Sequence, residues 1–278
     1  MAVTPADFDS YCLPLPVDPR LPNGGQKLCG FYDIKPSLFG VTDNLRTQAS
    51  NYGNRTENYN GVDVTLTSHF GNGGYVSGGV SVGRTVTDAC ELVKKVPEAL
   101  FGVDSQVSNT VPGTLSSGTA NSWSPAQFCR VSQPWSAGTQ AKFLAVYPLP
   151  WGLQASATYQ NIAGIPYTAT YPAPNAQILS TLGRNVGSCR GAATCNANVN
   201  VELVAPNTRY ENRLQQVDLR FTKRIQYERV TLRGNFDIYN VLNGSAILSE
   251  NTGYGVQWLT PYETMGGRLF KFSTQFEF

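Results

Sequence analysis

The last nine residues of the chain alternate between apolar and polar side chains, and they constrain the fold more than any other segment. Because successive side chains of a β-strand point to opposite faces, this segment predicts a strand with one apolar and one polar face. Soluble sheets also contain alternating strands, but four phenylalanines on one face make that face strongly apolar, as is typical of a lipid-facing barrel strand. The apolar face would hold Phe270, Phe272, Thr274, Phe276 and Phe278, and the polar face Lys271, Ser273, Gln275 and Glu277.

Similar alternation in six earlier segments predicts further strands. Short turns link these strands at one end, as at Gly71–Gly74 and Pro148–Trp151, and long segments link them at the other end. Outer-membrane barrels have short periplasmic turns and long extracellular loops, so we expect an all-β, antiparallel, up-and-down transmembrane β-barrel. The six segments are 62–70, 75–86, 140–147, 153–160, 217–222 and 229–241.

Two groups of motifs carry a family resemblance. Phe236–Asn243, which reads Phe-Asp-Ile-Tyr-Asn-Val-Leu-Asn, resembles the penultimate-strand signature of TonB-dependent outer-membrane receptors. Asn60–Leu66, Gly83–Asp88 and Arg268–Phe272 further resemble the subgroup whose full-length members carry a carboxypeptidase-regulatory-like domain before the plug. The likeness runs over nearly the whole chain but covers only the C-terminal part of such a receptor.

The resemblance implies that the chain supplies barrel wall and loops for the energised uptake of a bulky nutrient. Its partners would be outer-membrane lipid, a plug domain and the TonB complex of the full-length receptor. The long loops would be extracellular and the C-terminus periplasmic. The last strand would be the signal read by the barrel assembly machinery, through Gly267, Phe270, Phe272, Phe276 and Phe278.

The number of predicted strands decides whether they could close into a barrel. Seven strands are predicted, and bacterial single-chain barrels close with an even number, so at least one more strand must precede them. The region Leu38–Ala49 offers a weak candidate, in which Val41, Leu45 and Arg46 alternate poorly. We therefore divide the chain into a loop region with a possible weak strand, residues 1–60, and the barrel strands, residues 61–278. A family-type barrel of 22 strands would instead contain this chain as its last seven or eight.

The N-terminal segment Met1–Asp9 lacks the basic start and apolar stretch of a secretory signal. We therefore expect a fragment of a longer receptor, with the signal, the plug and the first strands upstream. A separately expressed piece and a misassigned start remain alternatives.

Six cysteines lie outside the predicted strands, two within each of three long segments. Six cysteines allow fifteen pairings, and the simplest joins the two in each segment, which suits an oxidising cell surface. A zinc site has little support, because close Cys-x-x-Cys spacing is absent and the chain has one histidine. The expected pairs are Cys12 with Cys29, Cys90 with Cys129, and Cys189 with Cys195.

Composition and motifs disfavour several other functions. A net charge of +2 shows no basic excess for nucleic acid, and no apolar run approaches the ~20 residues of a spanning helix. A mean hydropathy of −0.22 still suits a barrel, because only alternate strand positions need be apolar. His69 lies beside a turn without a nucleophile motif, so we expect no enzyme, cofactor or metal site. Asp7 and Asp9 could touch calcium but are more simply solvated.

Polar and aromatic residues near the strands have candidate roles. Asp218, Arg220, Arg233 and Asp237 are expected to form a charged ladder in the lumen. One set of aromatic residues would lie at the two bilayer interfaces or, alternatively, cap a soluble core. A second set, in the loops, could contact ligand. The first set is Tyr147, Trp151, Tyr159, Trp258 and Tyr262, and the second is Trp123, Trp135, Tyr167 and Tyr171.

Two other classes of protein fit the same pattern. One is a small autonomous outer-membrane barrel or adhesin of eight strands, which requires a strand in Leu38–Ala49. The other is a secreted, disulfide-stapled β-sandwich that binds carbohydrate or protein, with its Phe-rich final strand buried between two sheets.

Overall fold

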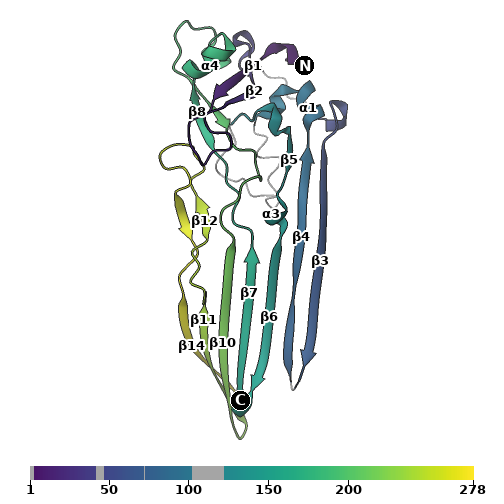
Figure 1. The fold of residues 1–278 in the computed structure, drawn as a ribbon, viewed down its shortest axis with the longest axis vertical. Coiled ribbons are helices and arrows are strands. Elements are labelled where there is room, and N and C mark those ends of the chain that lie inside the picture. The colour runs from purple at the N-terminus through teal and green to yellow at the C-terminus, as the bar shows by residue number, and fades with distance from the viewer. Residues whose placement is uncertain (1–2, 42–46, 72, 102–121) are drawn as a thin grey trace.

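Seven long strands form one antiparallel sheet in the computed structural model, which describes residues 3–41, 47–71, 73–101 and 122–278. The order across the sheet is β14-β11-β10-β7-β6-β4-β3, so each strand lies beside its neighbour in the chain (Figure 1). All seven predicted strands are confirmed. Their bounds are β3 Thr56–Phe70, β4 Gly74–Asp88, β6 Gln140–Leu149, β7 Leu153–Ile162, β10 Leu214–Tyr227, β11 Val230–Tyr239 and β14 Leu269–Glu277.

The register of the sheet keeps apolar residues opposite apolar residues. Phe236 of β11 lies opposite Phe272 of β14, and on its other side opposite Phe221 of β10. The rings of Phe236 and Phe272 stack with centroids 4.8 Å apart. The alternating side chains of neighbouring strands therefore align into one continuous apolar face and one continuous polar face. A slip of one residue would move the apolar side chains of a strand to the polar face of the sheet.

The sheet is open in the described part of the chain. Its edges are β3 and β14, and neither pairs with a further long strand among the described residues. The all-β antiparallel class is confirmed, but the described residues form no closed barrel. Around the expected weak strand, the structure has the 3₁₀ helices η2 (Pro36–Leu38) and η3 (Ala49–Asn51). Leu45 and Arg46 of that prediction lie outside the described residues.

Tight turns close the strands at one end of the sheet. β6 and β7 are joined by η6 (Pro150–Gly152), where Trp151 has φ 62°, and β10 and β11 by a turn in which Glu228 has φ 50°. Figure 1 shows these turns at the end of the sheet where the C-terminus lies. The expected asymmetry between short turns and long connections is confirmed.

The long connections fold together at the other end into a unit that we call the head (Figure 1). The head comprises residues 3–41, 47–55, 89–101, 122–139, 163–213 and 240–268. Its strands are β1 (Phe8–Pro14), β2 (Lys27–Ile34), β5 (Arg130–Ser132), β8 (Thr170–Pro174), β9 (Asn198–Glu202), β12 (Ile247–Glu250) and β13 (Pro261–Thr264). Its helical turns are η1 (Pro5–Asp7), α1 (Cys90–Lys95), η4 (Pro97–Leu100), η5 (Ala126–Cys129), α3 (Trp135–Gly138), α4 (Asn175–Leu182) and η7 (Gly187–Cys189). No helix in the described ranges is both long enough and apolar enough to cross a membrane.

The main hydrophobic core lies in the head, whereas the apolar face of the sheet is uncovered. Phe31 and Trp258 are 0% and 2% exposed in the head, but Phe272 of β14 is 77% exposed. The long connections are therefore folded and packed against one another. The Phe-rich final strand is also not buried between two sheets, which removes the feature that the sandwich alternative required. Core residues of the head include Leu13, Leu28, Phe31, Ile178, Val201, Leu203 and Trp258.

Truncating a buried residue of the head should destabilise it. Ile178 of α4 is fully buried, whereas the adjacent Leu179 is 41% exposed. We expect Ile178→Ala to lower the free energy of unfolding by about 2–5 kcal/mol, because the cavity adds to the lost burial. Leu179→Ala is the control and should change it by less than about 0.5 kcal/mol. Denaturant unfolding of the full chain in detergent, followed by tryptophan fluorescence, measures both. Equal losses would contradict a packed head.

Candidate functional site

The polar face of the sheet carries the charged ladder expected from the sequence. Arg220 of β10 pairs with Asp237 of β11, with Nη2 and Oδ2 3.0 Å apart. Asp218 accepts a hydrogen bond of 2.9 Å from Gln216, whose Oε1 accepts one of 2.7 Å from Gln160 of β7. The ladder therefore joins three neighbouring strands into one hydrophilic surface.

Arg233 extends this surface to the edge of the sheet but does not join the Asp218 and Asp237 group. Its Nη2 lies 3.1 Å from Oε2 of Glu277 on β14. Both side chains are about two-fifths exposed, so the pair adds little to stability. Because this pair carries charges to β14, the face opposite the apolar face is polar up to that edge of the sheet.

Asn240 explains why the family-like motif has an asparagine at the end of β11. It is buried, with φ 50°, a conformation that asparagine tolerates better than most residues. Its backbone N–H donates to Asp218 Oδ1 at 2.7 Å, and its side-chain Nδ2 donates to the carbonyls of Gly244 and Gly266 at 2.9 and 2.8 Å. The sequence presented this residue only as part of a signature. In the structure it fixes the point where the chain leaves the sheet and returns to β14.

The residues expected to form the assembly signal lie on the apolar face or next to it. Phe270, Phe272 and Phe276 are exposed on that face, and Phe278, which follows β14, is also exposed. Gly267 lies just before β14, beside Arg268, whose amide donates to Asn243 Oδ1 at 3.0 Å. Recognition of this strand by an assembly machinery stays a prediction.

The three expected disulfides are present, and all lie in the head. Cys12 and Cys29 lie opposite each other in β1 and β2, so this pair joins two short strands and not a structureless loop. The three bonds close 17, 39 and 6 residues, and longer closures remove more entropy from the unfolded chain. In the described ranges no cluster of three histidine, cysteine or acidic residues could hold a metal ion. His69 lies against the ring of Tyr75, with centroids 4.8 Å apart.

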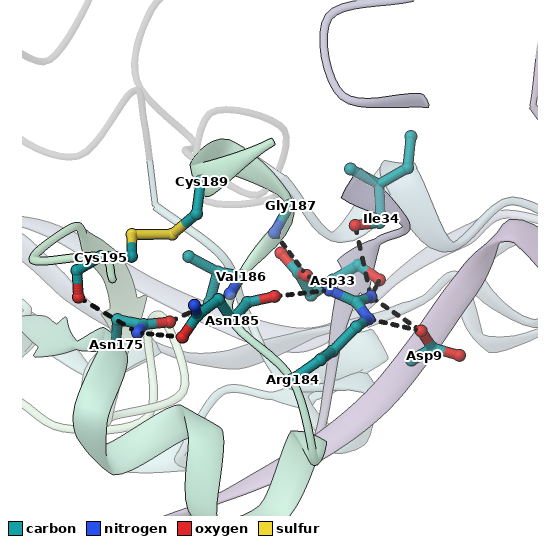
Figure 2. A network of polar contacts seen from close by, with 10 residues as sticks. All are labelled: Asp9, Asp33, Ile34, Asn175, Arg184, Asn185, Val186, Gly187, Cys189 and Cys195. Atoms are coloured by element: carbon teal, nitrogen blue, oxygen red, sulfur yellow. Dashed lines mark hydrogen bonds and ion pairs between the residues drawn. A yellow bond between two sulfur atoms is a disulfide. The ribbon is translucent and has the colours of Figure 1, made fainter. Parts of the chain in front are cut away.

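Arg184 follows α4 in the long connection between β7 and β10, and it holds the β1–β2 hairpin against this connection (Figure 2). Its guanidinium donates to Asp33 at 2.6 Å and to Asp9 at 2.7 Å, and the Gly187 amide also donates to Asp33 at 2.8 Å. Asp9 is thus paired and not simply solvated as expected. Burial lowers the pKa of Arg184, but the hydrogen bonds to Asp9 and Asp33 and the negative charges of these carboxylates together raise it by more, so the side chain stays charged.

Asn175 continues this network on the other side of Arg184 (Figure 2). Its side chain accepts from the Val186 amide at 3.0 Å and donates to Asn185 Oδ1 at 2.8 Å and to the Cys195 carbonyl at 3.3 Å. The network therefore ties α4 to the segment closed by the third disulfide. Arg184 meets Asp9 and Asp33 across 175 and 151 residues, so no local sequence pattern indicates these contacts.

Replacing Arg184 should loosen the head. Arg184→Met leaves the Asp33 carboxylate, whose side chain is 14% exposed, with the Gly187 amide as its remaining partner. We expect a loss of unfolding free energy of up to roughly 3–5 kcal/mol, the cost of an unpaired buried charge. Arg190→Met is the control, because its guanidinium lies over the Phe39 ring near the surface. Adding Asp33→Asn to Arg184→Met should recover part of the loss. Thermal unfolding that does not distinguish the two arginine variants would contradict this role.

Most of the aromatic residues in the long connections support the head. Trp258, expected at a bilayer interface or a core, lies in the core, where its Nε1 donates to the Thr168 carbonyl at 2.8 Å. The interface role is wrong for this residue, because the last long connection folds back into the head. Trp123, Tyr167 and Tyr171 pack against the same core.

The other aromatic residues are more exposed. Trp135 lies under the Arg84 guanidinium at 4.9 Å and remains 45% exposed. Tyr147, Trp151 and Tyr262 are also exposed, and their place at the bilayer interfaces stays a prediction, as does that of Tyr159, which stacks on Phe143.

Glu250 of β12 is a buried carboxylate that no sequence motif indicated. It is 8% exposed, and among the described residues neither carboxylate oxygen has a hydrogen-bond partner. Burial raises the pKa of Glu250 from its ordinary value of 4.5 to about 7, and the negative charge of Glu211 adds to the rise. The side chain is therefore largely protonated in mildly acidic water.

The stability of the head should depend on pH through Glu250. Between pH 4.5 and pH 7 the folded chain keeps a proton that the unfolded chain has lost, so the free energy of unfolding falls as pH rises through this window. We expect Glu250→Gln to flatten this fall, whereas Glu263→Gln, at an exposed position of β13, should leave it unchanged. Melting temperatures measured from pH 4 to pH 8 test this. An unaltered pH profile in Glu250→Gln would show that another group is responsible.

Comparison with known proteins gave no relative: no protein-family model matches this chain, and no curated protein matches it.

Proposed function

We propose that this chain is the C-terminal part of the barrel wall of a TonB-dependent outer-membrane receptor, which takes up a bulky nutrient. The observation that carries the proposal is the two-faced sheet. One face is a continuous band of exposed apolar side chains, and the other holds a ladder of charged and amide groups. A wall between lipid and a wet lumen requires this division.

The exposed apolar face favours lipid as its surroundings. Water-soluble proteins rarely expose large contiguous apolar patches, yet this face extends over all seven long strands. Strand length agrees, since a membrane-spanning strand needs about 9–11 residues. β6, β7 and β11 have 10 residues each and β14 has 9. β3 and β4, with 15 each, would extend beyond the bilayer toward the head.

The two ends of the sheet suggest its orientation. The head, with its three disulfides, suits the oxidising outer side of the membrane, and the short turns and the C-terminus suit the periplasmic side. The bacterial outer membrane is therefore the proposed location.

The open edges suggest where the rest of the receptor would attach. Unpaired edge strands are aggregation hazards that barrels remove by closure, and here both β3 and β14 have an unpaired side among the described residues. We infer that further strands of the full-length receptor pair with both edges. The plug would then contact the polar face, and the TonB complex would act through the plug. We propose no catalytic role for this chain.

Thiol labelling of neighbouring positions tests the two-faced wall. All six native cysteines are in disulfides, so one introduced cysteine is the sole free thiol. The matched pair Phe272→Cys and Ser273→Cys places this thiol on the apolar and the polar face of β14. In lipid vesicles, we expect a water-soluble maleimide to label Ser273→Cys rapidly and Phe272→Cys slowly, because lipid covers the apolar face.

The pair Val64→Cys and Thr65→Cys repeats the comparison at the other edge, on β3. Equal labelling of both faces in vesicles, or a chain that remains monomeric and folded without detergent, would overturn the membrane proposal. A chain that shows the labelling difference but migrates as a closed, heat-modifiable barrel by itself would favour the small autonomous barrel.

A further inference from the structure

A pocket of about 420 Å³ opens in the head where three long connections meet. One wall comes from the β1–β2 connection and the first two residues of β2, between positions 15 and 28. Gln127 and Phe128 of η5 form a second wall, and residues 203–209 after β9 form the third. The volume lies within the range of small-molecule sites, roughly 300–1,000 Å³. None of the sequence motifs pointed to this place, because its walls come together only in the folded head.

The pocket stands on rigid structure. Leu15, Leu28 and Leu203 line it and belong to the buried core of the head. Leu28 and Phe128 each immediately precede a disulfide-bonded cysteine, Cys29 and Cys129. The pocket is therefore preformed, and a ligand would not have to order its walls, which lowers the cost of binding.

Two exposed cations, Lys27 and Arg209, line the pocket. In the described part of the chain, neither Lys27 nor Arg209 forms an ion pair or a side-chain hydrogen bond, and no acidic residue lines the pocket. By contrast, Arg20 pairs with Asp18, and Arg184 pairs with Asp9 and Asp33. A concave site lined by a lysine and an arginine and by no acidic residue attracts an anion, and a guanidinium can hold a carboxylate through two hydrogen bonds.

Three amide side chains surround the cations. Asn23, Gln26 and Gln127 line the pocket and form no side-chain hydrogen bonds among the described residues. Each amide offers two donors and a carbonyl acceptor, a set that matches hydroxyl groups, which both donate and accept. The leucines beneath them and the Phe128 ring give an apolar floor for the C–H face of a ring.

We propose that this pocket binds an acidic saccharide, whose carboxylate lies between Lys27 and Arg209 and whose hydroxyl groups contact the amides. The assignment names the ligand class of the proposed receptor, and in that respect it rests on the proposed function. The binding itself involves only residues of the head, so it can be tested apart from membrane insertion and uptake.

Binding to the full chain, folded in detergent, tests the proposal with glucuronate and glucose as probes. The two sugars differ by one carboxylate, so we expect ligand-detected NMR to show contacts for glucuronate and none for glucose at equal concentration. Inorganic phosphate is the third probe. If phosphate displaces glucuronate as effectively as glucuronate itself does, the site recognises charge alone and the saccharide assignment is overturned.

Substitutions locate the site. Arg209→Gln should weaken glucuronate binding about tenfold or more, because a charge-assisted contact is lost. Arg209→Lys should retain part of it. Gln127→Ala, at an exposed position, should also weaken binding without disturbing the fold. Arg190→Gln, a head arginine outside the pocket, is the matched control.

The outcomes separate this inference from the proposed function. Unchanged glucuronate affinity in both pocket variants, with melting temperatures equal to that of the native chain, would overturn the pocket assignment while leaving the labelling test of the sheet intact. Glucuronate binding by a chain whose two sheet faces label equally would support the pocket and overturn the membrane wall.

Discussion

The in-phase register of the long sheet is the constraint on which the rest of the structure depends. Seven strands each alternate between apolar and polar residues, but two continuous faces arise only if every pair is aligned, as Phe236 is with Phe221 and Phe272. Sliding one strand by a single residue would place phenylalanines beside the Arg220–Asp237 pair. Burial of charge against apolar rings is costly, so each strand enforces the alignment of its neighbours.

The molecule divides its apolar residues between two environments. In the head they form an internal core around Phe31, Ile178 and Trp258, strengthened by three disulfides and by the Arg184 network. In the sheet they face outward and have no protein cover in the described ranges. A chain built in this way needs water around one end and an apolar medium around the other, which is the physical basis of the proposed place in a membrane.

Among the described residues, the head also contains a buried carboxylate without a hydrogen-bond partner and a pocket lined by two cations. Glu250 lies buried without a hydrogen-bond partner in the described structure, and Lys27 and Arg209 lie in a pocket without acidic partners. Burying Glu250 without a partner costs stability, whereas Lys27 and Arg209 are exposed and remain hydrated. The sheet shows the opposite arrangement, because much of its charged ladder is paired within the face. The proposed roles divide in the same way, with ligand recognition in the head and separation of lipid from water in the sheet.

The sequence by itself determined the seven strands, the side on which each residue lies and the short turns, and it made the three cysteine pairs the simplest of fifteen possible pairings. These features depend on side-chain period and on neighbours close in the chain, which local alternation records. The tertiary structure alone decided that the long connections pack into a head, that Trp258 is buried there, and that Asp9 and Asp33 meet Arg184 from 175 and 151 residues away. Contacts over such separations leave no periodic pattern, because they depend on how several connections fold against one another.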